Sequence, residues 1–151
     1  QLDALAGGER GALLVVDVDC FKDVNDTHGH LVGDLVLADI ARILRENFRI
    51  GDVVGRLGGD EFMVYLDRVG STDVVLGKCD RLRRAVERHE YPGTDCRVTI
   101  SVGVVLAHAG DTFDDLYGRA DEALYAAKRD GRNRCGLADG ALRSPKAAPA
   151  P

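Results

Sequence analysis

The chain contains 151 residues, of which 45% are hydrophobic and 30% are charged. This balance is typical of a globular domain and excludes intrinsic disorder of the whole chain. The 25 acidic and 20 basic residues leave a net charge of −5, which argues against a broad surface for binding DNA or RNA.

The first predicted element is a buried strand over Ala12–Val18, a short run of apolar and β-branched residues. Apolar residues at helical spacing then predict an amphipathic helix over Gly33–Phe48. Two short strands follow, over Val53–Arg56 and Glu61–Leu66. The segment between them, Leu57-Gly58-Gly59-Asp60, is typical of a hairpin turn.

The second half of the chain predicts a helix over Thr72–Glu90, a strand over Arg97–Leu106 and a helix over Thr112–Arg129, whose Tyr125 we expect in the core. A final short strand is predicted over Asn133–Leu137. The order βαββαβ, with an added helix and strand, predicts an α+β fold of the ferredoxin-like, palm type. In that arrangement helices pack on one face of an antiparallel central sheet.

The chain divides into three predicted parts. Residues 1–11 form an incomplete lead-in, 12–138 the folded domain, and 139–151 a disordered tail rich in Pro and Ala. The cysteines are scattered, without the spacing of a zinc site, and we expect all of them to be reduced thiols; they are Cys20, Cys79, Cys96 and Cys135.

Polar residues follow the first strand directly. Asp17 and Asp19 stand at its end, and a segment that we interpret as a polar loop continues to Asp34. Buried carboxylates require a cation, a hydrogen-bond donor or water, so such a loop is suited to holding Mg²⁺ and phosphate. An isolated Asp-x-Asp would more simply cap the strand, and Asp19 is expected to support the loop rather than bind a metal.

The hairpin Gly58–Phe62 carries two further acids. Its glycines permit positive φ and a close approach of a ligand to the backbone. Asp60 and Glu61 are adjacent, so their side chains point to opposite faces of the strand. Alone, this hairpin would be read as a solvated turn; beside the acidic strand end it adds carboxylates to one pocket.

Together these segments resemble the GGDEF family, the bacterial diguanylate cyclases. The hairpin spells Gly-Gly-Asp-Glu-Phe without substitution, and the resemblance extends over roughly residues 12–137. The other matching segments are Asp17–Lys22, Asn25-Asp26, Gly29-His30, Gly33-Asp34, Ser101–Gly103, Ala120-Asp121, Leu124–Lys128 and Gly131–Asn133.

The resemblance implies a role for each matching residue. Asp17, Asp60, Glu61 and the carbonyl of Val18 would bind Mg²⁺ or Mn²⁺, two ions per active site, and Asp60 would accept the proton of the attacking hydroxyl. Other residues would bind the substrate. The guanine-reading pair would be Asn25 and Asp34, and the phosphate-binding set would be Lys22, Lys128, Arg132 and the backbone at Cys20 and Phe21.

The implied reaction condenses two GTP molecules into cyclic di-GMP and releases two pyrophosphates. Because one domain holds one GTP, the resemblance implies a catalytic homodimer. No DNA, RNA or membrane contact is implied for this chain, whose apolar runs are short and which shows no signal peptide. We expect a cytoplasmic domain, either on its own or as the cytoplasmic part of a membrane-anchored or multidomain protein. The family's upstream Asp-x-Leu-Thr segment is not in this sequence, so we also expect a fragment without its first turn or sensory module.

A second site is implied by Arg49 and Asp52, which precede the hairpin at the spacing of the family's Arg-x-x-Asp product-inhibition motif. Arg81 or Arg84 of the second long helix would complete it. The simpler interpretation is a polar turn, with Asp52 as its acceptor.

Two other functions remain open. A catalytically silent GGDEF module would bind GTP or cyclic di-GMP as a sensor, but such modules usually lack metal ligands that are present here. Another palm-type nucleotidyl cyclase or polymerase is disfavoured by the complete pentapeptide and the guanine-reading pair.

Overall fold

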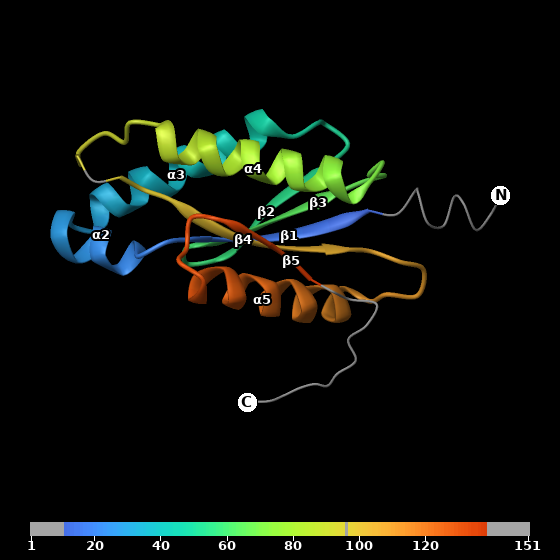
Figure 1. Cartoon of the computed structure of the whole chain (residues 1–151). Helices are drawn as coiled ribbons and strands as arrows, with labels where there is room; N and C mark the ends of the chain where they lie inside the picture. The colour runs from blue at the N-terminus through green and yellow to red at the C-terminus, as the bar shows by residue number, and fades with distance from the viewer. Residues whose placement is uncertain (1–10, 96, 139–151) are drawn as a thin grey trace.

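The structure is a computed structural model, and it describes residues 11–95 and 97–138. The expectations for the lead-in up to residue 10 and for the tail over 139–151 lie outside the described residues. The elements follow in the order β1 (Ala12–Val18), α2 (Phe21–His28), α3 (His30–Asn47), β2 (Val53–Gly58), β3 (Glu61–Leu66), α4 (Thr72–Arg88), β4 (Ile100–Leu106), α5 (Phe113–Arg129) and β5 (Cys135–Leu137) (Figure 1). None of these helices is long and apolar enough to cross a membrane.

The strands form one sheet in the order β2-β3-β1-β4-β5. Strand β1 lies at the centre and pairs antiparallel with both β3 and β4, while β5 joins β4 in parallel. Its central place explains why Ala12–Val16 are all fully buried. The predicted α+β, palm-type fold is therefore confirmed, with a mixed sheet because of β5.

Helices cover both faces of the sheet, so the expectation of helices on one face is wrong. Figure 1 shows α3 and α4 on one side and α5 on the other. Alternate residues of β1 point to opposite faces of the sheet. Val16 packs in the core under α3 and α4, and Val15 packs in the core under α5. Each fully buried apolar side chain of this kind contributes about 2 kcal/mol.

Helix α5 is held close to the sheet and has clear start and stop signals. Thr112 and Asp115 form a reciprocal capping box at its start, and Lys128 and Arg129 lie in its last turn, where the helix dipole favours cations. At Gly103 of β4 an added Cβ would overlap the carbonyl oxygen of Ala120. Glycine there lets the backbones of α5 and β4 approach, which places Lys128 at the end of β1.

Two local expectations differ from the structure. The segment read as a polar loop after β1 contains helix α2, which escaped detection because only Val24 of its residues is buried and no apolar stripe marks it. Tyr125, expected in the core, is 66% exposed and lies under the guanidinium of Arg129.

The expectation that all cysteines are free thiols is wrong for one pair. Cys79 of α4 and Cys135 of β5 form a disulfide, although 56 residues separate them in sequence. Cys20 is a free, exposed thiol, and Cys96 lies outside the described residues. Sequence spacing carries no information on a pairing that depends on the packing of α4 over β5.

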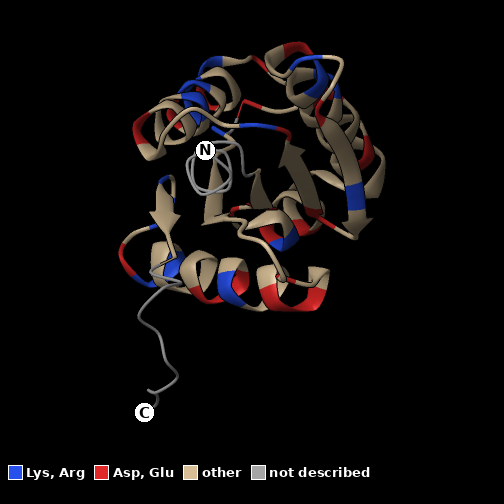
Figure 2. Cartoon of the chain, turned by 90° about the vertical axis from the view of Figure 1, so that its right-hand side faces the viewer, with Lys and Arg blue, Asp and Glu red and all other residues tan. Residues whose placement is uncertain are grey.

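Charged residues of both signs are interspersed along the helices (Figure 2). In the described part of the chain, exposed ion pairs such as Arg42–Glu46 on α3 combine the two signs within one helix. This distribution agrees with the small negative net charge of the chain.

Candidate active site

The site begins at the end of the central strand, where Asp17 lies opposite Glu61 of β3 and Ser101 of β4. Residues directly opposite on neighbouring strands share a face of the sheet. Asp17 and Glu61 therefore lie side by side, on the face that α5 covers. The apolar strand positions before Asp17 leave this carboxylate as the first polar group at the end of a buried core.

Asp17 is bound on one side only. Lys128 of α5 donates a hydrogen bond to its Oδ2, while its Oδ1 is buried without a hydrogen-bond partner in the described structure. Burial raises the pKa of Asp17, the hydrogen bond from Lys128 lowers it, and the charges of Asp60 and Glu61 raise it; the net shift is upward. Burial lowers the pKa of Lys128, but its bond to Asp17 and nearby carboxylates raise it overall.

The Gly-Gly-Asp-Glu-Phe hairpin is fastened to the end of β1. The carbonyl of Asp60 accepts a hydrogen bond from the backbone N–H of Val18 (3.2 Å). Gly58 and Gly59 have φ of +146° and +47°, and Arg56 closes the turn by donating to the carbonyl of Gly59 (3.0 Å). The predicted convergence of the hairpin with the acidic strand end is thus present.

Glu61 has a partner that sequence reasoning missed. The hydroxyl of Tyr117, on α5, donates to Glu61 Oε1 at 2.9 Å. Burial and this hydrogen bond raise the pKa of Tyr117 to about 12, so the hydroxyl stays protonated as a donor. Helical periodicity could have found it, because Tyr117 precedes Lys128 by three turns of about 3.6 residues and shares its face.

Asp19 is buried and fully engaged as a structural acceptor. Its carboxylate accepts from the hydroxyls of Thr99 (2.7 Å) and Ser101 (2.6 Å) and from the backbone N–H of Asn133 (3.0 Å). These bonds join the β1–α2 segment to the start of β4 and to the turn after α5. This supporting position is the one expected for Asp19.

The oxygen atoms gathered here suit a hard cation. Carboxylates are the ligands that Mg²⁺ prefers, and the unpartnered Oδ1 of Asp17 is a buried acceptor that such an ion would satisfy. Within residues 11–95 and 97–138 no group of three or more His, Cys, Asp or Glu side chains already stands in a metal-binding arrangement. Asp17, Asp60 and Glu61 are nevertheless close enough for their charges to act on one another.

Helix α2 begins directly after the end of β1. Cys20 adopts left-handed φ and ψ of 54° and 35°, and its carbonyl accepts from the N–H groups of Asp23 and Val24. The amides of Phe21 and Lys22 then stand at the helix start, where N–H groups lack intrahelical partners and favour anions. Lys22 itself is exposed and pairs with Asp26 at 2.8 Å.

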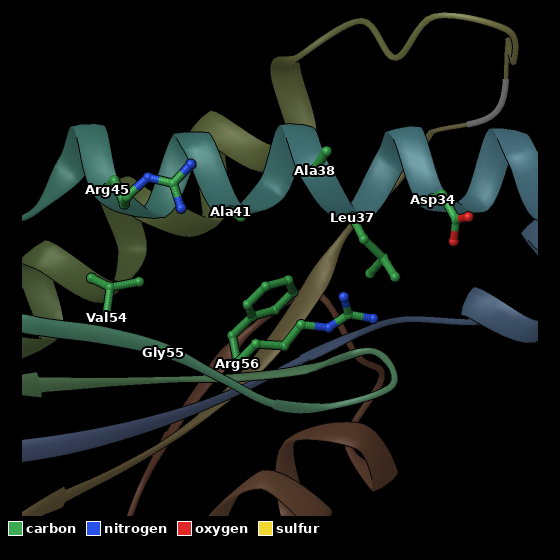
Figure 3. A pocket seen from close by; sticks show the side chains of 9 residues that line it. Asp34, Leu37, Ala38, Ala41, Arg45, Val54, Gly55 and Arg56 are labelled. Carbon is green, nitrogen blue, oxygen red and sulfur yellow. The ribbon is translucent and has the colours of Figure 1, made fainter.

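A groove of about 550 Å³ runs between α3 and β2 (Figure 3). Asp34 lies near one end and Arg45 near the other, with Leu37 and Arg56 between them. Asn25 does not line this groove but lies across Gly33, where an added Cβ would overlap its side-chain oxygen. That oxygen is buried without a hydrogen-bond partner in the described structure.

The comparisons with known proteins decide the family. The family described as "Diguanylate cyclase, GGDEF domain" matches residues 1–134. The chain belongs to the GGDEF family. Diguanylate cyclase DgcM of Escherichia coli is 41% identical over 134 residues, which are 89% of this chain and 32% of the relative. Diguanylate cyclase A of Treponema denticola is 39% identical over 139 residues, covering 90% of this chain and 37% of the relative.

Solved GGDEF structures share the fold. The GGDEF domain of YfiN (TpbB) from Pseudomonas aeruginosa is 36% identical, with a TM-score of 0.82 and coverage of 91% of this chain and 88% of that one. The coiled coil and GGDEF domain of DgcB from Caulobacter crescentus, in complex with c-di-GMP, is 32% identical, with a TM-score of 0.79 and coverage of 91% and 74%. The chain spans about a third of the length of the curated relatives named above.

The remaining predicted residues of this GGDEF domain lie in turns and on α4, outside the acidic cluster that Asp17, Asp60 and Glu61 form. Arg132 is exposed in the turn after α5, and Arg81 is exposed on α4. Arg49 follows α3 with its side chain 65% exposed, whereas that of Asp52 is 1% exposed. Asp52 accepts from the backbone N–H groups of Arg49 (3.0 Å) and Asp67 (3.2 Å), so it orders the turn.

The raised pKa of Asp17 predicts a specific stability change. The stability of wild type relative to Asp17→Asn should fall as the pH rises from about 4 toward neutral, because the amide does not ionise and still offers an oxygen to Lys128. The native protein binds the Asp17 proton more tightly than the unfolded chain does. In the unfolded chain the pKa of this carboxyl is near 3.8. Wild-type stability therefore falls as the pH rises through the native pKa.

Thermal melts of both proteins from about pH 4 to pH 8 measure this effect. The pH-dependent part of the difference between the two proteins should vanish on acidification toward the unfolded-state pKa of Asp17. Asp114→Asn, on the exposed first turn of α5, is the matched control and should show no such trend. A difference in melting temperature between wild type and Asp17→Asn that does not change with pH would contradict the account.

Proposed function

We propose that this chain is a diguanylate cyclase domain, which condenses two GTP molecules into cyclic di-GMP and releases two pyrophosphates. The observation that carries the proposal is the convergence of Asp17, Asp60 and Glu61 with Lys128 at the end of β1. The relatives from Escherichia coli and Treponema denticola, named diguanylate cyclases, support the same reaction.

Magnesium or manganese would be held by Asp17, Asp60, Glu61 and the carbonyl of Val18, two ions per site. A bound divalent cation offsets phosphate charge and eases deprotonation of a hydroxyl. The buried, unpartnered Oδ1 of Asp17 supports this assignment. Tyr117 would fix the orientation of Glu61, and Lys128 would hold the second oxygen of Asp17 and face the phosphates.

Guanine would be read at the end of the α3–β2 groove. The carboxylate of Asp34 can accept from N1–H and the exocyclic amine of guanine, a pair of donors that adenine does not offer together. Leu37 and other apolar groove residues would cover the ring. Asn25, with its free side-chain oxygen next to Gly33, would contribute a further polar contact.

The triphosphate would extend from the groove toward the acidic cluster. The amides at the start of α2, at Phe21 and Lys22, would donate to phosphate oxygens, and Cys20 would shape this turn. Lys22, Lys128 and Arg132 would offset the phosphate charge. These contacts would hold the α-phosphorus for attack by an incoming hydroxyl.

The nucleophile is the 3′-hydroxyl of a second GTP. Asp60 would take its proton, because its carboxylate stands in the hairpin beside Asp17. One domain supplies one guanine groove in this region, so each reaction requires two copies that face one another. The proposed partners are therefore GTP, cyclic di-GMP and a second copy of the chain, in the cytoplasm where GTP is available.

Product would also bind away from the active site, at Arg49. This residue follows the last turn of α3, roughly 20 Å along the helix from Asp34 at 1.5 Å per residue. Its exposed guanidinium can stack on guanine or bind phosphate. Asp52 would position the turn, and Arg81 would complete the site, since Arg84 is paired with Asp80 at 2.9 Å.

Asp60→Asn should reduce cyclic di-GMP synthesis by at least about 100-fold while the protein stays folded, because the amide is a poor base and a poor metal ligand. Chromatography of the products formed from GTP and Mg²⁺ measures this effect. Asp73→Asn, on the exposed first turn of α4, is the control. Substantial product from folded Asp60→Asn would refute the role of Asp60, and GTP binding without product by wild type would favour the silent sensor.

Asp34→Ala should lower the preference for GTP over ATP by about tenfold or more, because hydrogen bonds to a charged group contribute about 1.5–3 kcal/mol. Calorimetric titration with each nucleotide measures the preference. Glu46→Ala removes an exposed carboxylate from the far end of α3 and should leave it unchanged. An unaltered preference in Asp34→Ala would exclude this residue from base recognition.

Arg49→Ala should weaken cyclic di-GMP binding by at least about tenfold, because charged hydrogen bonds to phosphate or guanine are lost. GTP affinity should stay the same, since the turn lies beyond the Arg45 end of the groove, roughly 20 Å along α3 from Asp34. Calorimetry with each ligand separates the two effects, with Arg88→Ala on the exposed last turn of α4 as control. Equal product affinity for wild type and Arg49→Ala would rule out the second site.

A further inference from the structure

The turn that follows α5 has an unusual backbone. Gly131, Arg132 and Asn133 are consecutive residues with positive φ, of +130°, +63° and +50°. Side chains with a Cβ are disfavoured in this region, so a turn of this kind persists only where its surroundings hold it. Arg132, one of the two non-glycine residues, is also a proposed phosphate ligand.

Hydrogen bonds from neighbouring segments hold this turn at Asn133. Its side-chain oxygen accepts from Arg83 Nη1 (3.0 Å), and its side-chain nitrogen donates to Glu87 Oε2 (3.2 Å). Its backbone N–H donates to the buried carboxylate of Asp19 (3.0 Å). Residues of α4 thus bind both the oxygen and the nitrogen of the Asn133 side chain. The segment after β1 binds the backbone N–H of Asn133.

Helix α4 presents these groups in a fixed arrangement. The side chain of Arg83 is only 17% exposed, and it is also bound to Asp80 (2.9 Å) and Glu87 (3.2 Å). The disulfide between Cys79 and Cys135 joins the same helix to the strand that follows the turn. The turn is therefore tied to α4 by hydrogen bonds and by a covalent link.

The turn of residues 131–133 follows directly after the end of α5. Arg132 N–H donates to the carbonyl of Ala127 (3.0 Å), and Gly131 N–H donates to that of Lys128 (3.3 Å). A change in the conformation of Asn133 would therefore displace Arg132 relative to Lys128. Both side chains are proposed to bind the triphosphate, and their fixed spacing lowers the entropic cost of that binding.

We propose that Asn133 is a positioning residue for triphosphate binding, and that Arg83 and Glu87 of α4 hold it in place. This inference rests on the proposed function, because it assigns Arg132 and Lys128 to the phosphates of GTP. Asn133 and Arg83 act through the turn and do not contact the nucleotide.

Arg83 and Arg84 supply a matched pair of variants. Both arginines bind Asp80, but Arg84 does so with its side chain 57% exposed, and in the described residues it makes no hydrogen bond to the turn. Arg83→Gln and Asn133→Ala should each weaken GTP binding about tenfold in the presence of Mg²⁺. Arg84→Gln should not, and no variant should alter the affinity for guanosine, which lacks phosphates.

Calorimetric titration with GTP and guanosine measures these affinities, and thermal melts establish that each variant is folded. The double variant Arg83→Gln/Asn133→Ala should lose little more than either single variant, because both changes release the same turn. Equal GTP affinity for Arg83→Gln and Arg84→Gln would overturn the inference. So would a parallel loss of guanosine affinity, which would indicate general disruption.

Hydrogen exchange at the Asn133 amide gives a readout that does not depend on nucleotide. Exchange should be faster in Arg83→Gln than in wild type and unchanged in Arg84→Gln. If Arg83→Gln is too unstable to study, Arg83→Lys, which keeps the charge but not the planar fork, replaces it. Unchanged exchange in the folded variant would refute the support from α4. Failure of wild type to bind GTP would instead contradict the proposed function, and the exchange comparison would still decide whether α4 holds the turn.

Discussion

The structure depends on the way its central strand ends. Strand β1 is hydrogen-bonded on both edges and buried on both faces, so it contains no polar side chain until Asp17. There a carboxylate stands at the edge of the apolar core, bound by Lys128 through one oxygen and, within residues 11–95 and 97–138, without a hydrogen-bond partner at the other. Because the single bond from Lys128 leaves the other buried oxygen without a donor in the described residues, an anion here still raises the energy of the folded state.

The neighbouring segments are arranged around this carboxylate. The Gly-Gly-Asp-Glu-Phe hairpin is fastened to Val18, α5 brings Lys128 and Tyr117 across the sheet, and α2 begins directly after the strand. Asp19 then joins the strand end to the turn after α5, and α4 holds that turn through Asn133. Segments far apart in sequence thus meet at one end of the sheet, beside the α3–β2 groove.

Much of this fold could be predicted from sequence, because the apolar periodicity of β1, β3 and the long helices is strong. The site residues that follow strand ends could also be predicted, since the acids, the glycines and the hairpin are local in sequence. Helix α2 was missed because it buries only Val24, and its polar residues resemble a loop. The close approach of α5 to β4 depends on Gly103, and no local pattern reports it.

Side-chain partners were the least predictable part of the site. The bonds of Tyr117 to Glu61 and of Arg83 to Asn133 join residues that are 56 and 50 positions apart. Hydrogen bonds of this range depend on how whole elements pack, whereas single-sequence patterns carry information over a few residues. The exposure of Tyr125 could not be predicted for a related reason. Helical spacing beside a core residue does not decide whether a tyrosine ring is buried or lies on the surface.

The central claim is that one end of this sheet binds GTP, with its base in the α3–β2 groove and its phosphates at the acidic cluster. A crystal structure with Mg²⁺ and a non-hydrolysable GTP analogue tests it most directly. The account predicts guanine within hydrogen-bond distance of Asp34, and metal density between Asp17, Asp60 and the phosphates. Nucleotide bound elsewhere on the domain, or metal that leaves Asp17 paired only with Lys128, would contradict it.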